Sequence, residues 1–135
     1  MGGDAEVLKL KVYKVYKVNQ KMVIEKFEDI LSWKKSEILT TEIYNLLKNN
    51  RDYSFKDQIQ RASVSIMNNI AEGFERRSNK EFKQFLFIAK GSAGEMRSML
   101  HLATQLGYIK DEEYKKLSAS IIEISKLLSG LIKTL

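Results

Sequence analysis

The chain has 135 residues, enough for one domain with a single hydrophobic core, and its lack of proline favours long helices. It has no cysteine and one histidine, which excludes disulfides, thiolate metal sites, histidine-rich metal sites and cysteine nucleophiles. The formal net charge of +6 is compatible with an acidic partner such as nucleic acid. No secretory signal or membrane span is recognisable, so we expect a cytoplasmic location and no membrane partner.

Residues 1–26 have a different pattern from the rest of the chain. Lysines alternate with valine, leucine and tyrosine between Leu8 and Val18, at a period that fits neither a strand nor a helix. We interpret this segment as an N-terminal extension, flexible or edge-pairing. A basic arm that becomes ordered on an anionic partner is the alternative interpretation.

The remainder, residues 27–135, is predicted to contain four helices. The first spans about residues 29–48. The second begins at Ser54, with Asp57 in the capping-box position, and extends to about Glu75.

The third and fourth helices also have recognisable ends. Ser78 and Glu81 repeat the capping signature, and Gly107 can adopt the left-handed conformation that ends a helix. The fourth helix starts at Asp111 and carries an apolar heptad seam of Tyr114, Leu117, Ile121, Ile124, Leu128, Leu131 and Leu135. Because short connections force neighbouring helices to run antiparallel, we expect an all-α, up-down-up-down four-helix bundle.

The second helix has two apolar stripes. One consists of Phe55, Ile59, Ala62, Ile66, Ile70 and Gly73, and the other, about 120° around the helix, of Val64, Met67, Ala71 and Phe74. We favour the interpretation that each stripe packs on one neighbouring helix. The alternative is that the second stripe mediates homo-oligomer formation.

Polar residues also recur at helical spacing on the second and third helices. Antiparallel pairing brings Glu95 opposite Gln58 and Arg61, and Gly91 and Gly94 would permit close helix approach beside it. We predict an internal structural polar network of Gln58, Arg61, Ser65, Asn69, Glu72, Ser92 and Glu95.

An enzyme is the less favoured interpretation of these carboxylates. Glu72 and Glu95 could form an acid–base pair or hold a metal, but the Glu-x-x-His motif of di-iron bundles is absent. No serine, lysine or aspartate is accompanied by a histidine base in a recognisable motif. We therefore expect no catalytic residues, cofactor, metal or small-molecule substrate.

A basic stripe follows the outer face of the third helix. Its spacing alternates cations with Phe87 and His101, and no acidic residue interrupts it. An ordinary solvated helix surface is the alternative interpretation. The predicted nucleic-acid-binding residues are Arg76, Arg77, Lys80, Lys83, Phe87, Lys90 and Arg97.

Several of these segments together resemble one protein family. The residues that carry the resemblance are Phe27 to Leu31 with Trp33 and Lys34, Ser65 to Gly73, Arg76 to Ser78, Phe82 to Leu86, Ile88 to Ser92, Glu95, Leu100 and Leu106 to Ile109. They resemble the bacterial four-helix-bundle proteins encoded by intervening sequences in 23S ribosomal RNA genes. The match covers about residues 27–135.

The resemblance implies a small helical bundle, grouped with ribosomal proteins by name. It also implies likeness to the accessory proteins of diversity-generating retroelements, which form ring-like pentamers with a basic nucleic-acid-binding surface. We therefore expect a non-enzymatic, self-associating bundle, a pentamer by this resemblance, that binds structured nucleic acid, RNA rather than DNA. The alternative is an oligomeric protein-interaction scaffold that docks a ribosomal or reverse-transcriptase-like partner.

Overall fold

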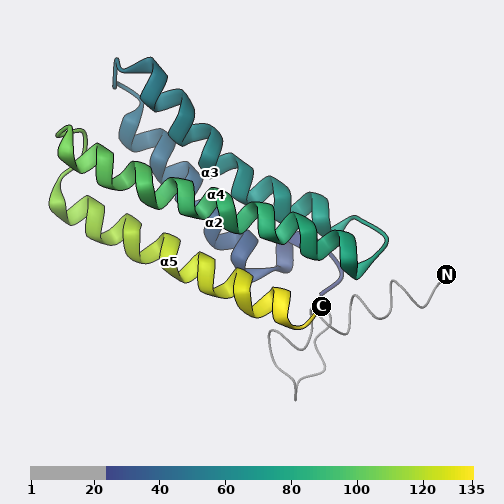
Figure 1. Cartoon of the computed structure of the whole chain (residues 1–135). Helices are drawn as coiled ribbons and strands as arrows, with labels where there is room; N and C mark the ends of the chain where they lie inside the picture. Colours follow the sequence, from purple (N-terminus) through teal and green to yellow (C-terminus); the bar gives the residue numbers. More distant parts are fainter. Residues whose placement is uncertain (1–23) are drawn as a thin grey trace.

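The structure of the chain, a computed structural model, describes residues 24–135. A short 3-10 helix, η1 (Phe27–Asp29), precedes four helices: α2 (Leu31–Leu47), α3 (Tyr53–Phe74), α4 (Asn79–Gln105) and α5 (Asp111–Lys133). Short turns join consecutive helices, which run in alternating directions (Figure 1). The predicted all-α four-helix bundle is confirmed.

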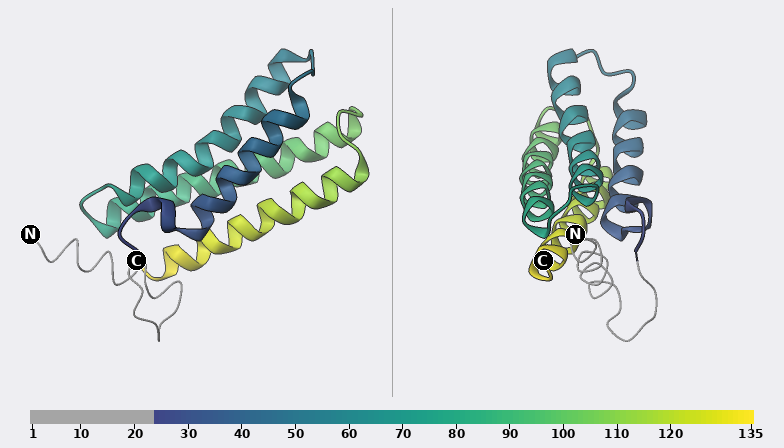
Figure 2. Two further views of the ribbon diagram at one scale, coloured as in Figure 1. Left: turned by 180° about the vertical axis from the view of Figure 1, so that it is seen from behind. Right: turned by 90° about the vertical axis from the view of Figure 1, so that its right-hand side faces the viewer.

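The four helices pack side by side in a ring. Both α2 and α4 contact α3 and α5, and the views from behind and from the side show this arrangement (Figure 2). The turn between α2 and α3 and the turn between α4 and α5 lie at one end of the bundle. The turn between α3 and α4 and the end of α5 lie at the other (Figure 2).

The core extends along the whole bundle. The first apolar stripe of α3, from Phe55 to Gly73, is buried, as is the α5 seam from Leu117 to Leu131. Burying one such aliphatic side chain contributes roughly 1.5–3 kcal/mol, so both seams contribute substantially to the stability of the fold. The second α3 stripe is buried at Phe74, which belongs to the core, and half-buried at Val64, Met67 and Ala71.

The beginning of the compact unit differs from its predicted position. Ile24 is only 3% exposed and belongs to the hydrophobic core, so ordered packing starts before residue 27. The rest of the predicted N-terminal extension, residues 1–23, lies outside the described residues.

The start of α3 differs from the predicted start in its capping residue. The side chain of Asp52, not that of Ser54, accepts a hydrogen bond from the Phe55 backbone N–H, with a nitrogen–oxygen distance of 3.2 Å. Aspartate is a favourable N-cap, because its carboxylate satisfies an N–H group that has no partner within the helix. Asp52 also accepts a bond from Tyr108, which fixes its position from outside the helix.

The predicted ends of α4 are confirmed. Ser78 Oγ accepts a hydrogen bond from the Glu81 N–H at 3.1 Å. After the helix, Gly107 has a φ of +74°, and its N–H donates to the Thr104 carbonyl while the Tyr108 N–H donates to the Ala103 carbonyl. These two bonds form a Schellman motif, which requires a left-handed residue at this position.

The buried face of α4 does not contain all of its large apolar residues. Its buried residues are Phe82, Leu86, Ala89, Ala93, Met96, Met99, Leu100 and Ala103. Ile88, Leu102 and Leu106 remain about half exposed. Three alanines on the buried face allow close packing, and they leave large apolar side chains on the outside of the bundle.

Candidate nucleic-acid interface

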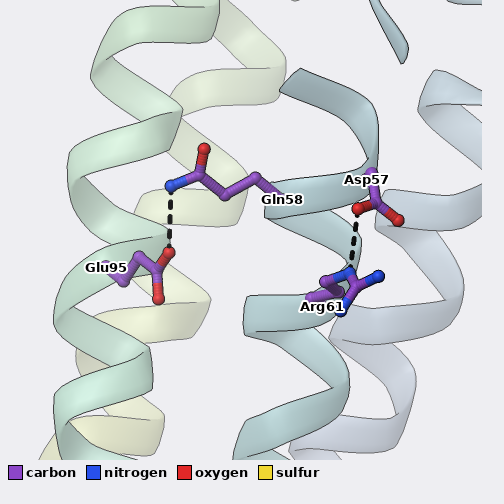
Figure 3. A network of polar contacts seen from close by, with 4 residues as sticks. All are labelled: Asp57, Gln58, Arg61 and Glu95. Carbon is purple, nitrogen blue, oxygen red and sulfur yellow. Dashed lines mark hydrogen bonds and ion pairs between the residues drawn. The ribbon is translucent and has the colours of Figure 1, made fainter. Parts of the chain in front are cut away.

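The polar residues of α3 and α4 lie at the surface instead of inside the bundle. Gln58 Nε2 donates to Glu95 Oε2 at 3.3 Å, so the predicted proximity of these two residues is present (Figure 3). Arg61 does not reach Glu95, because its Nε donates to Asp57 Oδ2 at 2.8 Å one turn away in the same helix (Figure 3). All four side chains are exposed, so water solvates Glu95, and the prediction of an internal network is wrong for Gln58, Arg61 and Glu95.

The remaining members of the predicted network form two further contacts. Ser65 Oγ and Ser92 Oγ are 2.8 Å apart across the α3–α4 contact, and Asn69 Nδ2 donates to Ser65 Oγ at 3.0 Å. The three hydrogen-bonded residues lie at the edge of the helix contact, where they are only partly shielded from water. Glu72 accepts a bond from Arg76 Nη2 at 3.0 Å and is exposed. The seven residues therefore form separate contacts and not one network.

The two glutamates are too far apart to act as an acid–base pair. Glu95 contacts Gln58, which lies fourteen residues before Glu72 on α3, a rise of roughly 21 Å. Within residues 24–135, no group of three histidine, aspartate or glutamate side chains is placed to hold a metal ion.

The close approach of α3 and α4 occurs at a different glycine from those predicted. A Cβ atom added at Gly91 or Gly94 would meet nothing within 4 Å, so the role predicted for these two residues is wrong. A Cβ atom at Gly73 would lie 2.6 Å from Phe85 Cβ and 2.9 Å from Phe82 Cδ1. Gly73 is therefore the residue that lets α4 pack directly on α3.

The basic stripe lies on the outside of α4, as its spacing predicts. Lys80, Lys90 and Arg97 are exposed and Lys83 is half-buried. None of these four cations forms an ion pair with another residue of the described chain. The Phe87 ring, 55% exposed, lies among them on α4. This face therefore presents free positive charge beside an exposed aromatic ring.

The two arginines before α4 differ from one another. Arg76 is engaged, because it pairs with Glu72 and its guanidinium carbon lies 4.7 Å from the centre of the Phe85 ring. Arg77 is exposed and makes no ion pair within residues 24–135. At the other end of the stripe, His101 Nε2 lies 3.0 Å from the hydroxyl of Tyr114 on α5.

A groove of about 470 Å³ extends the basic surface from α4 onto α5. Its lining residues are Lys90, Arg97, Ile122, Ser125, Lys126, Ser129, Gly130 and Lys133. The sequence prediction included Lys90 and Arg97 but missed Lys126 and Lys133. Within each pair the two residues are seven apart in the sequence, which places them on the same side of their helix. That shared spacing is the signal for the groove in the sequence, and the stronger apolar seam of α5 masks it.

The exposed apolar residues of α4 lie on its α3 side. Ile88 and Leu102, 53% and 48% exposed, stand seven residues before and after Glu95, which contacts α3 through Gln58. Leu106 follows one turn later and is 48% exposed. Within residues 24–135, no helix combines the length and apolar content that a membrane span requires.

Known proteins share both the sequence pattern and the fold of this chain. The model of the 23S rRNA-intervening sequence protein family matches residues 28–130. A crystal structure from Bacteroides thetaiotaomicron, of a protein with unknown function from the S23 ribosomal protein family, is 32% identical with a TM-score of 0.72. That similarity covers 78% of this chain and 98% of the other. No curated protein matches the chain.

Proposed function

Because this chain belongs to the 23S rRNA-intervening sequence protein family, we propose that it is a non-enzymatic bundle that self-associates and binds structured nucleic acid, RNA in preference to DNA, in the cytoplasm. The observation that carries the proposal is the row of unpaired cations on α4, at Lys80, Lys83, Lys90 and Arg97. The family name, which links these proteins to 23S ribosomal RNA, supports RNA as the ligand.

Phosphate contacts supply the binding energy in this proposal. Each cation that neutralises a phosphate releases condensed counterions, and the affinity therefore falls steeply with salt. Exposed Phe87 can stack on an unpaired base, which adds affinity with little sequence preference. Phosphate contacts carry no base information, so binding is expected to depend on the shape of the RNA more than on its sequence.

Self-association is supported by the apolar residues on the α3 side of α4. Ile88, Leu102 and Leu106 lie on the same side of one helix, and each is about half exposed in the described chain. A second copy of the bundle would remove them from water. We propose a homo-oligomer, with a pentamer as the form that the family resemblance favours. The same apolar surface favours the second candidate function, a scaffold that docks a ribosomal or reverse-transcriptase-like protein.

Fluorescence anisotropy with a labelled, folded RNA tests the nucleic-acid proposal across about 50 to 200 mM salt. The test variant carries Lys80→Gln, Lys83→Gln and Lys90→Gln. A matched control carries Lys34→Gln, Lys48→Gln and Lys115→Gln, three exposed lysines outside the stripe and the groove, with the same reduction in charge. We expect the test variant to bind more weakly, with a salt slope reduced by about one for each phosphate that it no longer neutralises.

The control separates local contacts from net charge. Equal weakening of both variants would show that total charge, and not the α4 stripe, determines affinity. Absence of RNA binding by the wild-type protein at low salt would contradict the proposal and favour the protein scaffold.

A further inference from the structure

The groove between α4 and α5 carries two facing pairs of cations. Lys90 and Arg97 come from α4, and Lys126 and Lys133 from α5, and the members of each pair are seven residues, or about 10.5 Å, apart along the helix. None of the lining residues is acidic, and none of the four cations forms an ion pair with another described residue. Like charges brought together in this way repel, and an anion in the groove removes that repulsion.

Two serine hydroxyls in the groove add neutral hydrogen-bond donors. Ser125 and Ser129 are one turn apart on α5 and half-buried, and neither hydroxyl has a hydrogen-bond partner in the described part of the chain. Some other helical hydroxyls bond to backbone carbonyls, as Thr40 does to Ser36 at 2.8 Å, whereas the buried hydroxyl of Ser32 has no partner among residues 24–135. Serine hydroxyls are common donors to phosphate oxygens in nucleic-acid complexes.

A glycine in the wall of the groove leaves the α5 backbone uncovered. A Cβ atom at Gly130 would meet nothing within 4 Å, so packing within the described bundle does not require glycine there. Glycine inside a helix costs about 1 kcal/mol relative to alanine. Gly91 and Gly94 have the same open space, but Gly130 alone of the three lines the groove, where the absence of a side chain lets a ligand approach the backbone.

We propose that this groove holds the sugar–phosphate backbone of an unpaired segment, a loop or bulge, of the bound RNA. This inference rests on the proposed RNA-binding function and specifies which part of the RNA binds. A paired helix is a broad cylinder that reaches the cations on the rim but not the serine hydroxyls between two packed helices. A single strand can enter the groove, and Phe87, three residues before Lys90, is placed to stack on a base that the strand turns outward.

Two variants of α5 test the groove independently of the α4 stripe. Lys126→Gln with Lys133→Gln removes half of its charge, and Gly130→Leu fills it. Gly91→Leu is the matched control for the second, because Gly91 is also an exposed helical glycine with no neighbour within 4 Å but does not line the groove. The RNA probes are a hairpin with a large unpaired loop and a fully paired duplex with the same number of phosphates.

For the looped hairpin, we expect affinity to fall about tenfold or more in the lysine variant, because phosphate contacts dominate binding. Gly130→Leu should also weaken binding without lowering the melting temperature, since leucine is the better helix former. Gly91→Leu should leave the affinity unchanged. The duplex should bind the wild-type protein more weakly than the hairpin and respond less to both α5 variants.

The outcomes distinguish this inference from the proposed function. If the Lys80, Lys83 and Lys90 variant binds RNA more weakly while both α5 variants bind normally, the groove is not the site, although the protein still binds RNA. Equal binding of duplex and hairpin, with equal weakening in the α5 variants, would overturn the assignment to an unpaired segment. If the wild-type protein binds neither probe, both proposals fail.

Discussion

At the scale of single residues, the space around each helical glycine determines whether packing requires glycine at that position. Gly73 lies where α3 and α4 are closest, and Phe82 and Phe85 occupy the space that its side chain would need. Gly91 is equally helical but faces open space. The same substitution at the two positions should therefore have opposite effects on stability.

We expect Gly73→Ala to lower the free energy of unfolding by about 1–3 kcal/mol, because the new methyl group forces the Phe85 side chain or the helix backbone to move. Gly91→Ala should raise the free energy of unfolding by up to about 1 kcal/mol, since alanine favours the helix and meets no neighbour. Urea denaturation followed by circular dichroism measures both changes. Equal stability of Gly73→Ala and the wild-type protein would contradict the packing assigned to Gly73.

The polar residues show what periodicity alone cannot determine. Spacing correctly placed Gln58 and Glu95 close together, because helix pairing and rise fix which residues face one another. It could not show whether that line faces the core or the solvent. The buried face of α4 includes Ala89, Ala93 and Ala103, small residues that a search for large apolar side chains passes over, and Glu95 lies outside that face.

At the scale of elements, the four helices could be predicted because each has a clear period and clear ends. Ser78 and Gly107 mark the ends of α4 through their own side-chain and backbone chemistry. The start of α3 was harder to place, because Asp52 and Ser54 are both good N-cap residues. Tyr108 decides between them, since its hydroxyl donates to Asp52 Oδ2 at 2.6 Å from the turn between α4 and α5. This tertiary contact is not visible in the local sequence.

The hydrogen bond between Tyr108, in the turn after α4, and Asp52, in the turn before α3, predicts a pH dependence of stability. The hydrogen bond from Tyr108, together with that from the Phe55 N–H, lowers the pKa of Asp52 below its usual value, and the carboxylate of Asp52 raises the pKa of Tyr108 above its usual value. The contribution of Asp52 is present above its unfolded pKa, near about 3.9, and is lost as the pH falls through its lowered folded pKa. The contribution of Tyr108 is present below about pH 10 and is lost as the pH rises through its raised folded pKa.

Tyr108→Phe removes the hydroxyl that links the two turns. The difference in free energy of unfolding between this variant and the wild-type protein should be largest near neutral pH. It should shrink in acid below about pH 4 and in alkali above about pH 10, as each partner changes its charge. Chemical denaturation at a series of pH values gives the difference directly. Equal stability of the two proteins at every pH would show that the hydroxyl contributes nothing, and that Tyr108 acts only through the packing of its ring on Phe55, with ring centres 5.2 Å apart.

At the scale of the whole molecule, α4 has two different exposed sides. Toward α5 it contributes Lys90 and Arg97 to the basic groove, and toward α3 it exposes Ile88 and Leu102. The basic stripe could be predicted from α4 alone. The groove could not, because it depends on which side of α5 meets α4 and therefore on the order of helices around the bundle. A nucleic-acid surface and a self-association surface can thus lie on one helix without overlapping.

Ile88→Glu with Leu102→Glu tests the self-association surface. Both residues are about half exposed in the bundle, so the substitutions should leave the helical content and melting temperature nearly unchanged. At an interface between copies, two buried carboxylates per copy would have no partner, and the oligomer should dissociate. Sedimentation equilibrium should then report the mass of one chain, 15.6 kDa, for the variant and a multiple of it for the wild-type protein.

The matched control is Ser98→Glu with Gln105→Glu, which adds the same charge at exposed positions of α4 outside the apolar set. It should remain oligomeric. If linked copies bind one RNA together, dissociation also removes their avidity, and the Ile88 and Leu102 variant should bind RNA more weakly although its cations are intact. A wild-type protein that sediments as a single chain at all concentrations would contradict self-association and leave the apolar side of α4 to a different protein partner.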